Sequence, residues 1–470
     1  MRRPSSLRVA FAFSPYAMIR FLERYSLLCL LAVLAACSDD TVDNEGGQPE
    51  GYSCIELFLS SEPESSTRVD ANAMQEELMK TALVIMVNGD NKVERIFPVA
   101  QNGTGWHERY GVGTITIENG TYTFYSFGNI DYEVKDAVKY TATINDLTFT
   151  VGELIPDGLD DYTWTANYNA VDITTLPNGI PMTNKEEYLV NSSRSITLHL
   201  FRMLSKISFE FTNNTADAIT VKKIELSQVT PNGTDIYLFP PKEGENIVNR
   251  FPTTDFKNTS MVAYEGTELN IPSEESATKM AYLNESTSQH PTGQMPLTIT
   301  LERKDKAGST TKVEDVRYAL MSLSSIPRNA YVVVPVTLTD YVLELKAFFY
   351  APIGGYPPYK IDTKDNEFYC TFSTGGDFAL RPFLYKFEDR NEKEKWFELT
   401  DATKVDGFSL TVSDPNTIFS VQPSFSAGEI RGTLNGSEGT ASVRLSVRLK
   451  TENSKVIQEY NRTIYIIVKK

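Results

Sequence analysis

The sequence predicts an all-β protein built as a row of β-sandwich modules. Short runs in which apolar and polar residues alternate recur along the chain, and clusters of turn-forming residues separate them. The chain holds 24 Tyr and 25 Phe, which favour the half-buried surface of a sheet. Ala71–Lys80 is the only plausible helix of note, and a short one. With 470 residues, the chain has room for about three domains.

Charge and cysteine content exclude several classes of function. The formal net charge is −16 and no run of Lys and Arg stands out, so we expect no nucleic-acid partner. Four cysteines are present, and two of them, Cys29 and Cys37, lie within or directly after the first 36 residues. Cys54 and Cys370 remain, far apart and in different predicted domains. No Cys or Cys/His spacing suggests zinc, so we expect neither a disulfide framework nor a metal site.

The first 36 residues have the features of an export signal. Basic residues precede a short apolar core, Leu27–Leu34, which is far shorter than the ~20 residues that a membrane-spanning helix needs. The core runs into the sequence Leu-Ala-Ala-Cys, which ends at Cys37 and resembles the lipobox of bacterial lipoproteins. We therefore expect residues 1–36 to be a lipoprotein signal peptide and Cys37 to carry the lipid. The alternative is a plain secretory signal that ends near a chance cysteine.

An acidic tether is expected over residues 37–51. Ser38-Asp39-Asp40 follows the candidate lipidation site, and the stretch is polar and contains glycine. Such a sequence resembles the acidic tag that sends lipoproteins of this kind to the outer cell surface. The alternative is a solvated spacer without a sorting role. The predicted location is the outer membrane, with the chain lipid-anchored and exposed at the cell surface.

The first predicted domain spans residues 52–195. Ile55, Leu57 and Leu59 alternate with less apolar neighbours and predict a strand. Asn88–Asn91 is a turn between two further strands, and Asn119-Gly120 predicts a type I′ hairpin.

The second predicted domain spans residues 196–340, and its strands begin within the run Ser195–Phe211. The stretch Pro240–Pro291 is polar, and we expect it to form long surface loops.

The third predicted domain spans residues 341–470. Alternation at Tyr341, Leu343 and Leu345 predicts a strand that a Pro- and Gly-rich stretch then ends. Alternation over Val443–Leu449 predicts another, and Thr463–Val468 is expected to close the sandwich or to serve as a donor strand. Strands at this spacing, with little helix, indicate an Ig-like β-sandwich.

Taken in order, these features resemble the fimbrillin superfamily of Bacteroidota, the FimA- and Mfa-type pilus proteins. The lipobox comes first, then the strand Cys54–Ser60 and Thr67-Arg68, then the Asn-Gly-rich strands, and finally Leu200–Ile207 at the junction of two domains. The resemblance covers about residues 37–340. It implies tandem transthyretin-like β-sandwiches, so residues 341–470 are additional to a simple two-domain shaft subunit.

In this family a protease cuts after an arginine that follows the first strand, and the strand is then exchanged between subunits. Carried over, the exchanged strand contains Ile55, Leu57 and Leu59, and the candidate cleavage follows Arg68. Arg68 is otherwise an ordinary loop arginine, and an uncut first strand makes the chain a tip or anchor subunit. The additional third domain favours tip or anchor over shaft.

The resemblance implies a structural and adhesive role: a fimbrial subunit that joins others by β-strand addition, sits on the outer membrane through lipid and contacts a host protein or glycan. The alternative is a glycan-binding surface lipoprotein of a nutrient-uptake system, and an enzyme or inhibitor is a distant third. His107, His199 and His290 are widely spaced, and no catalytic or phosphate-binding motif is present. We therefore expect no enzyme activity and no cofactor.

Overall fold

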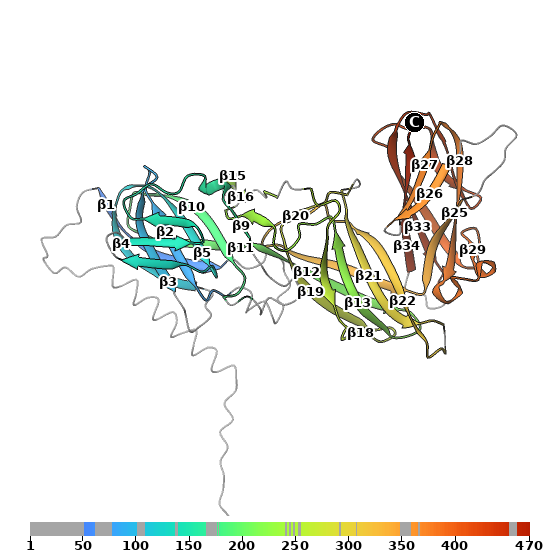
Figure 1. Ribbon diagram of the computed structural model, residues 1–470, viewed down its shortest axis with the longest axis horizontal. Helices are drawn as coiled ribbons and strands as arrows, with labels where there is room; N and C mark the ends of the chain where they lie inside the picture. The colour runs from blue at the N-terminus through green and yellow to red at the C-terminus, as the bar shows by residue number, and fades with distance from the viewer. Residues whose placement is uncertain are drawn as a thin grey trace, which may run out of the picture. The chain divides into compact units, whose positions relative to one another are not determined.

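A computed structural model describes residues 51–470 except 62–77, 101–108, 137–139, 166–175, 177, 240–241, 244–245, 248–249, 252–254, 291–292, 307, 348–358, 365–366 and 451–457. In these residues the regular structure is strands and three short 3-10 helices, which confirms the all-β prediction (Figure 1). Within the same ranges, no helix is long and apolar enough to cross a membrane. Leu78–Lys80, the described end of the helix predicted over Ala71–Lys80, is not helical.

The first sandwich is dominated by a seven-stranded sheet with the order β3-β2-β5-β10-β11-β1-β4. Its strands are β1 (Tyr52–Ser61), β2 (Ala82–Val87), β3 (Val93–Ala100), β4 (Arg109–Glu118), β5 (Gly120–Gly128), β10 (Met182–Val190) and β11 (Arg194–Arg202). The strands β10 and β11 are paired at only two positions, Met182 with Arg202 and Thr183 with Phe201, so the sheet turns a corner there. Apolar side chains from the strands on both sides of this corner share one core. The sheet therefore folds on itself as a sandwich.

A small sheet and a short ladder complete this sandwich. The small sheet consists of β6 (Glu133–Asp136), β7 (Tyr140–Ile144) and β8 (Leu147–Thr150), and the ladder pairs β9 (Thr163–Thr165) with β14 (Asp235–Tyr237). The 3-10 helix η1 (Leu159–Asp161) precedes β9. A second core forms where Phe149 of the small sheet meets Phe127 of β5. Ile236, Leu238 and Phe239 join this core from a distant part of the sequence.

Turn predictions in this sandwich had different outcomes. The turn at Asn88–Asn91 is confirmed: β2 and β3 pair antiparallel, and Asn91 has a φ of 60°. The hairpin predicted at Asn119-Gly120 is wrong, because β4 pairs with β1 whereas β5 pairs with β2 and β10. Neither residue has the positive φ that a type I′ turn requires. Instead, the chain crosses from one half of the folded sheet to the other, and Asn119 accepts a hydrogen bond from Ser53 at 2.5 Å.

The second sandwich begins at β12 (Leu204–Asn214), which pairs antiparallel with β19 (Ser276–Asn284) and parallel with β24 (Tyr331–Thr339). Facing it is a sheet of β17 (Ser260–Glu265), β13 (Ile219–Ser227), β21 (Met295–Lys304) and β22 (Lys312–Met321), with β18 (Asn270–Ile271) beside β13. Shorter ladders pair β15 (Lys242–Glu243) with β16 (Asn246–Ile247) and β20 (Ser286–Thr287) with β23 (Ser325–Ile326). The core between the two sheets includes Phe209, Val221 and Leu297.

Two features of this region depart from the sequence predictions. Pro240–Pro291 is not a set of loops, since it contains β17 and β19, and β19 pairs along nine residues of β12. The boundary predicted at residues 195/196 falls within β11, whose residues up to Leu200 pair with β1. We therefore propose Met203, between β11 and β12, as the point where the first sandwich ends.

The third sandwich packs two sheets around a core that includes Phe368, Leu384 and Val447. One sheet contains β25 (Tyr341–Ala347), β28 (Gly376–Lys386), β32 (Glu429–Leu434) and β31 (Phe419–Ser426), with β29 (Phe397–Glu398) beside β28. The other has the order β26 (Tyr359–Lys364), β27 (Glu367–Phe372), β34 (Gln458–Val468), β33 (Gly439–Leu449) and β30 (Val405–Ser413). The 3-10 helices η3 (Phe387–Asp389) and η4 (Lys393–Lys395) follow β28.

The end of the chain is an internal strand of this last sandwich. β34 pairs parallel with β27 and antiparallel with β33, so both of its edges are occupied over Ile464–Val468. This confirms the prediction that Thr463–Val468 closes its own sandwich. A strand held on both sides within its own domain is not free to serve a neighbour as a donor.

Candidate functional site

The predicted exchange strand lies inside the first sandwich. Ile55, Leu57 and Leu59 of β1 have no exposed surface, and they face the core that the two halves of the seven-stranded sheet share. The residues between them are half-buried, so the alternation read from the sequence is confirmed.

Both edges of β1 are paired. One edge runs parallel to β11 from Ile55↔Arg194 to Ser61↔Leu200, and the other adjoins β4, the last strand of the sheet. Side chains add local contacts: the Ser193 hydroxyl accepts a hydrogen bond from the Cys54 amide at 2.9 Å, and the Arg109 guanidinium lies 4.1 Å from the ring centre of Phe58. Removal of β1 would leave an apolar groove bordered by the unpaired edges of β11 and β4.

The remaining predicted site residues lie outside the described part of the chain. Cys37, the expected lipidation site, precedes residue 51, and Arg68, the candidate cleavage residue, falls within 62–77. Lipidation and cleavage therefore stay predictions.

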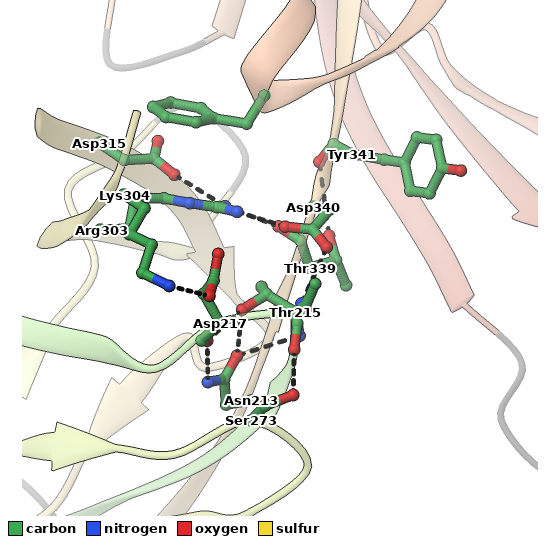
Figure 2. A network of polar contacts seen from close by, with 12 residues as sticks. Asn213, Thr215, Asp217, Ser273, Arg303, Lys304, Asp315, Thr339, Asp340 and Tyr341 are labelled. Atoms are coloured by element: carbon green, nitrogen blue, oxygen red, sulfur yellow. Dashed lines mark hydrogen bonds and ion pairs between the residues drawn. The ribbon is translucent and has the colours of Figure 1, made fainter. Parts of the chain in front are cut away.

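A polar network that the sequence did not predict centres on Asp340 (Figure 2). Asp340 is the single residue between β24 and β25, where the second sandwich passes to the third. Its carboxylate accepts a hydrogen bond from the Arg303 guanidinium and another from the Ala216 amide, the latter at 3.0 Å. Its carbonyl accepts a bond from the Phe387 amide at 2.7 Å. Three separate segments are thus tied to one residue.

Arg303 is buried, with only 7% of its surface exposed, and it bridges two carboxylates. Besides Asp340, it lies 3.6 Å from a carboxylate oxygen of Asp315, which also receives the Arg317 guanidinium at 2.7 Å. A buried cation needs such counter-charges, because its transfer out of water is costly. Arg303 therefore depends on Asp315 and Asp340 for its place in the fold.

The ring of Phe387 is surrounded by arginines. The guanidinium carbons of Arg303, Arg390 and Arg317 lie 4.7, 4.5 and 5.8 Å from its ring centre. Arg390 in turn pairs with Asp305 at 2.5 Å. These cation–π contacts and hydrogen bonds hold η3, which follows β28 of the third sandwich, against the end of β21. Asp340 is the single residue that separates β24 from β25 at this junction.

The neighbouring loop is fixed by Asn213, which is fully buried. Its side-chain amide donates to the carbonyl oxygens of Asp217, Ile271 and Pro272 at 2.9–3.0 Å. Its side-chain oxygen accepts bonds from the amide and hydroxyl of Thr215. Every side-chain polar atom of Asn213 has a partner, which positions the adjacent Ala216 amide for Asp340 (Figure 2).

A buried ion pair links the first two sandwiches. Arg328 and Glu285 are 2.5 Å apart, with side-chain exposures of 2% and 0%. Arg328 also donates to the carbonyl oxygens of Tyr237 and Leu238, which belong to the segment that joins the first core. The partners of Arg328 lie 43 to 91 residues away from it in the sequence, so no local sequence pattern could have predicted this site.

His290 lies in a third buried polar cluster. Its Nε2 atom is 3.3 Å from a carboxylate oxygen of Glu367, and the Tyr465 hydroxyl donates to the same carboxylate at 3.3 Å. The Tyr369 hydroxyl also donates to Glu367, at 3.0 Å, and its ring stacks on that of Tyr465. The Glu367 carboxylate is thus fully engaged. The cluster joins β27 and β34 to the segment that precedes β21.

The described ranges contain no grouping of three or more His, Cys, Asp or Glu side chains suited to a metal ion. His199 lies in β11 opposite Ser60, far along the sequence from His290. Cys370 is buried in the third core, and burial raises the pKa of its thiol to about 12. A thiol that stays protonated is a poor nucleophile. Cys54 and Cys370 are both free thiols.

Comparisons with known proteins give distant likenesses. A scan against protein-family models finds no match, and a search of curated proteins finds none either. Among solved structures, the tip fimbrial protein Mfa3 of Porphyromonas gingivalis, truncated at its C-terminus, is 10% identical with a TM-score of 0.34, over 63% of this chain and 95% of that one. A candidate cell adhesion protein of Bacteroides ovatus is 10% identical with a TM-score of 0.34, over 61% and 92%.

A third likeness is to a candidate polysaccharide-binding protein of Bacteroides thetaiotaomicron, which is 10% identical with a TM-score of 0.27, over 56% of this chain and 78% of that one. At such values the likeness is distant and carries no argument about the function of this chain.

Proposed function

We propose that this chain is a lipid-anchored surface protein that joins other subunits by exchange of β1, and that it occupies the tip or the base of a fimbrial assembly. Other subunits and the outer membrane are its proposed partners. The observation that carries the proposal is the position of β1, a strand with three fully buried apolar side chains and a ladder on each side.

The free energy of burying β1 favours its replacement by another strand over its removal without replacement. Burial of Ile55, Leu57 and Leu59 contributes about 5–9 kcal/mol, at ~1.5–3 kcal/mol for each side chain. An empty groove would forfeit that free energy and expose the edges of β11 and β4. A strand from another subunit restores both, which is the physical basis of strand addition.

A terminal position in the assembly is supported by β34 and by the third sandwich as a whole. A shaft subunit must offer a strand to its neighbour, but β34 is held between β27 and β33 within its own sandwich. The third sandwich follows the second without a linker and adds a module that a shaft repeat does not need. These two features favour the tip or the base over the shaft.

The proposal is tested by treating the purified full chain with an Arg-specific protease, adding a labelled peptide with the sequence of Tyr52–Ser61 because β34 is not free to act as a donor, and running the product, unboiled, on a denaturing gel. We expect cleavage at Arg68 and a labelled band at the mass of the chain that disappears on boiling. Arg68→Gln removes both, whereas Arg95→Gln, on the exposed side of β3, is the matched control and leaves both unchanged. Cleavage at Arg68 without retention of the peptide would contradict strand exchange.

A further inference from the structure

The strand β30 is an open edge of the third sandwich. It lies at the end of the sheet β26-β27-β34-β33-β30, and it pairs with β33 from Val405↔Leu449 to Ser413↔Ser442. In the described part of the chain, no backbone group of Phe408–Ser413 bonds to another strand or to a loop. An edge strand directs every second residue's N–H and C=O groups away from its sheet. The outer edge of β30 therefore presents a row of donors and acceptors for a further strand.

The other ends of the two sheets carry features that discourage a further strand. The strands β25 and β26 contain lysines, namely Lys346, Lys360 and Lys364. The strand β31 contains Pro423, and its pairing with β32 shifts register twice. Charged residues, proline and bulges of this kind protect edge strands from unwanted pairing. Gly407–Ser413 of β30 reads Gly-Phe-Ser-Leu-Thr-Val-Ser and has none of these residues, so β30 is the edge of this sandwich most open to pairing.

The inner face of β30 is only partly covered by its own sandwich. Phe408, Leu410 and Val412 stand opposite three fully buried Val and Leu residues of β33, which places them on the inward face. Phe408 is nevertheless 46% exposed, and Leu410 and Val412 are half-buried. The ring of Phe408 meets that of Phe425 in β31, with ring centres 4.1 Å apart. A strand added beside β30 would cover this apolar rim with its own inward side chains.

On the outer face, a guanidinium group lies over the backbone of β30. Arg448 of β33 is exposed, and one of its terminal nitrogens lies 3.0 Å from the position that a Cβ atom of Gly407 would take. The glycine thus gives this side chain room to lie across β30. The register places Glu459 of β34 opposite Arg448, and Asp406 precedes Gly407. Within the described residues, however, Arg448 forms neither a hydrogen bond nor an ion pair.

The charge beside this edge is positive. Arg444 is the second exposed arginine on the outer face of β33, and it stands opposite Thr411 of β30. The neighbouring outward residues of β30, Ser409 and Ser413, are uncharged. A strand added to β30 would lie one strand spacing farther out, about 4.8 Å, within reach of a side chain as long as arginine. Carboxylates on the outer face of that strand are favoured, and lysines there are opposed.

We propose that β30 is a docking edge for an extended segment of another protein in which apolar and acidic side chains alternate. The backbone of the segment extends the sheet, its apolar side chains cover Phe408 and Phe425, and its carboxylates pair with Arg448 and Arg444. This interaction goes beyond the proposed exchange of β1 and does not depend on it, because β1 and β30 belong to different sandwiches.

The test uses the purified, uncleaved full chain and a fluorescein-labelled synthetic peptide, Val-Glu-Val-Glu-Val-Glu-Val, with binding followed by fluorescence anisotropy. We expect this peptide to bind at least about tenfold more tightly than its counterpart with Lys in place of Glu. Arg448→Gln should weaken binding of the acidic peptide about tenfold, because it removes a charge-assisted hydrogen bond, and should not change binding of the counterpart with Gln in place of Glu. Lys469→Gln, at an exposed position beyond the far end of β34, is the matched control and should bind as the parent does.

Hydrogen exchange, followed by mass spectrometry, locates the bound peptide. The amides of Phe408–Ser413 should gain protection when the acidic peptide is added, whereas those of Ile55–Ser61 in β1 should not change. Phe408→Ala removes the half-exposed ring and should weaken binding while the circular dichroism spectrum stays that of the parent.

No binding of the acidic peptide, equal binding of the Lys peptide, unchanged binding by Arg448→Gln, or binding without protection of Phe408–Ser413 would overturn the proposal. Protection of these amides that rises with the concentration of the chain alone would assign the edge to a second copy, and would overturn it as well.

Discussion

Asp340 accepts a hydrogen bond from the buried guanidinium of Arg303 at the one residue that separates β24 from β25. The pair lies where the chain leaves one sandwich and enters the next, with Phe387 and Ala216 bound to the same aspartate. A junction built in this way ties segments of the second and third sandwiches to one residue.

Asp340→Ala is expected to destabilise the junction. The substitution leaves Arg303 buried with one counter-charge fewer, and we expect the free energy of unfolding to fall by about 2–4 kcal/mol. Asp340→Asn keeps the shape and an acceptor and should cost less. Guanidinium unfolding, followed by tryptophan fluorescence, measures both.

The matched control is Lys312→Gln, which breaks the exposed Lys312–Glu302 pair of the same sandwich. An exposed pair is screened by solvent and contributes little, so the control should be close to neutral. Equal effects of Asp340→Ala and Lys312→Gln would show that the buried network does not hold the junction.

The stability of the first sandwich should depend on the side chains on the inward face of β1. Leu57→Ala deletes a fully buried side chain and is expected to lower the free energy of unfolding by about 2–5 kcal/mol. Ser60→Ala, at a half-buried position of the same strand, should stay within about 0.5 kcal/mol of the parent. Urea unfolding checks both, and two near-neutral variants would contradict a core role for β1.

Stability of the third sandwich should decline in acid through Glu429. Burial alone would raise the pKa of this carboxyl, but hydrogen bonds from Arg381 and Arg431 outweigh it and hold the pKa below its ordinary value. A depressed folded-state pKa contributes stability that is complete above the unfolded-state pKa of about 4.3 and is lost as the pH falls through the lower folded value.

The measurement is urea unfolding of the parent and of Glu429→Gln at several pH values from 7 to 3. We expect the variant to be less stable at pH 7 by about 1–3 kcal/mol and to lose less stability than the parent below about pH 4.3. Parallel pH profiles for the two proteins would contradict the role assigned to Glu429.

Lipidation at Cys37 is checked by metabolic labelling with radioactive palmitate. The parent should take up label and sediment with membranes, whereas Cys37→Ala should lose the label. Cys54→Ala, at a half-buried cysteine of β1, is the control and should keep it. Label that remains on the Cys37→Ala variant would show that another residue carries the lipid.

Local sequence patterns predicted much of the fold. The alternation of Val443, Leu445 and Val447 predicted an inward face, and all three are fully buried. The same period identified the buried face of β1. Patterns of period two succeed because they report which face of a strand meets the core, whatever the partner strand is.

Such local patterns could not predict which strands or side chains distant in the sequence would pair. Asn119-Gly120 has the composition of a hairpin turn, but packing across the sandwich sends β4 and β5 to different partners. β19 begins with the largely polar stretch Ser276–Lys279, and its apolar run, Met280–Leu283, is only four residues long, so its pairing with β12 could not be predicted from the sequence. Arg303 and Asp340 are 37 residues apart and meet only after the second sandwich has closed.

The proposed strand addition is tested most directly by following the exchange of β1 itself. An isotope-labelled peptide with the sequence of Tyr52–Ser61 is added to the full chain before and after cleavage by an Arg-specific protease, and amide hydrogen exchange of Ile55–Ser61 is followed by mass spectrometry. We expect the native strand to be protected in the intact chain and the labelled peptide to take its protected place after the cut. A peptide that stays unprotected while the native strand remains protected after cleavage at Arg68 would contradict strand exchange.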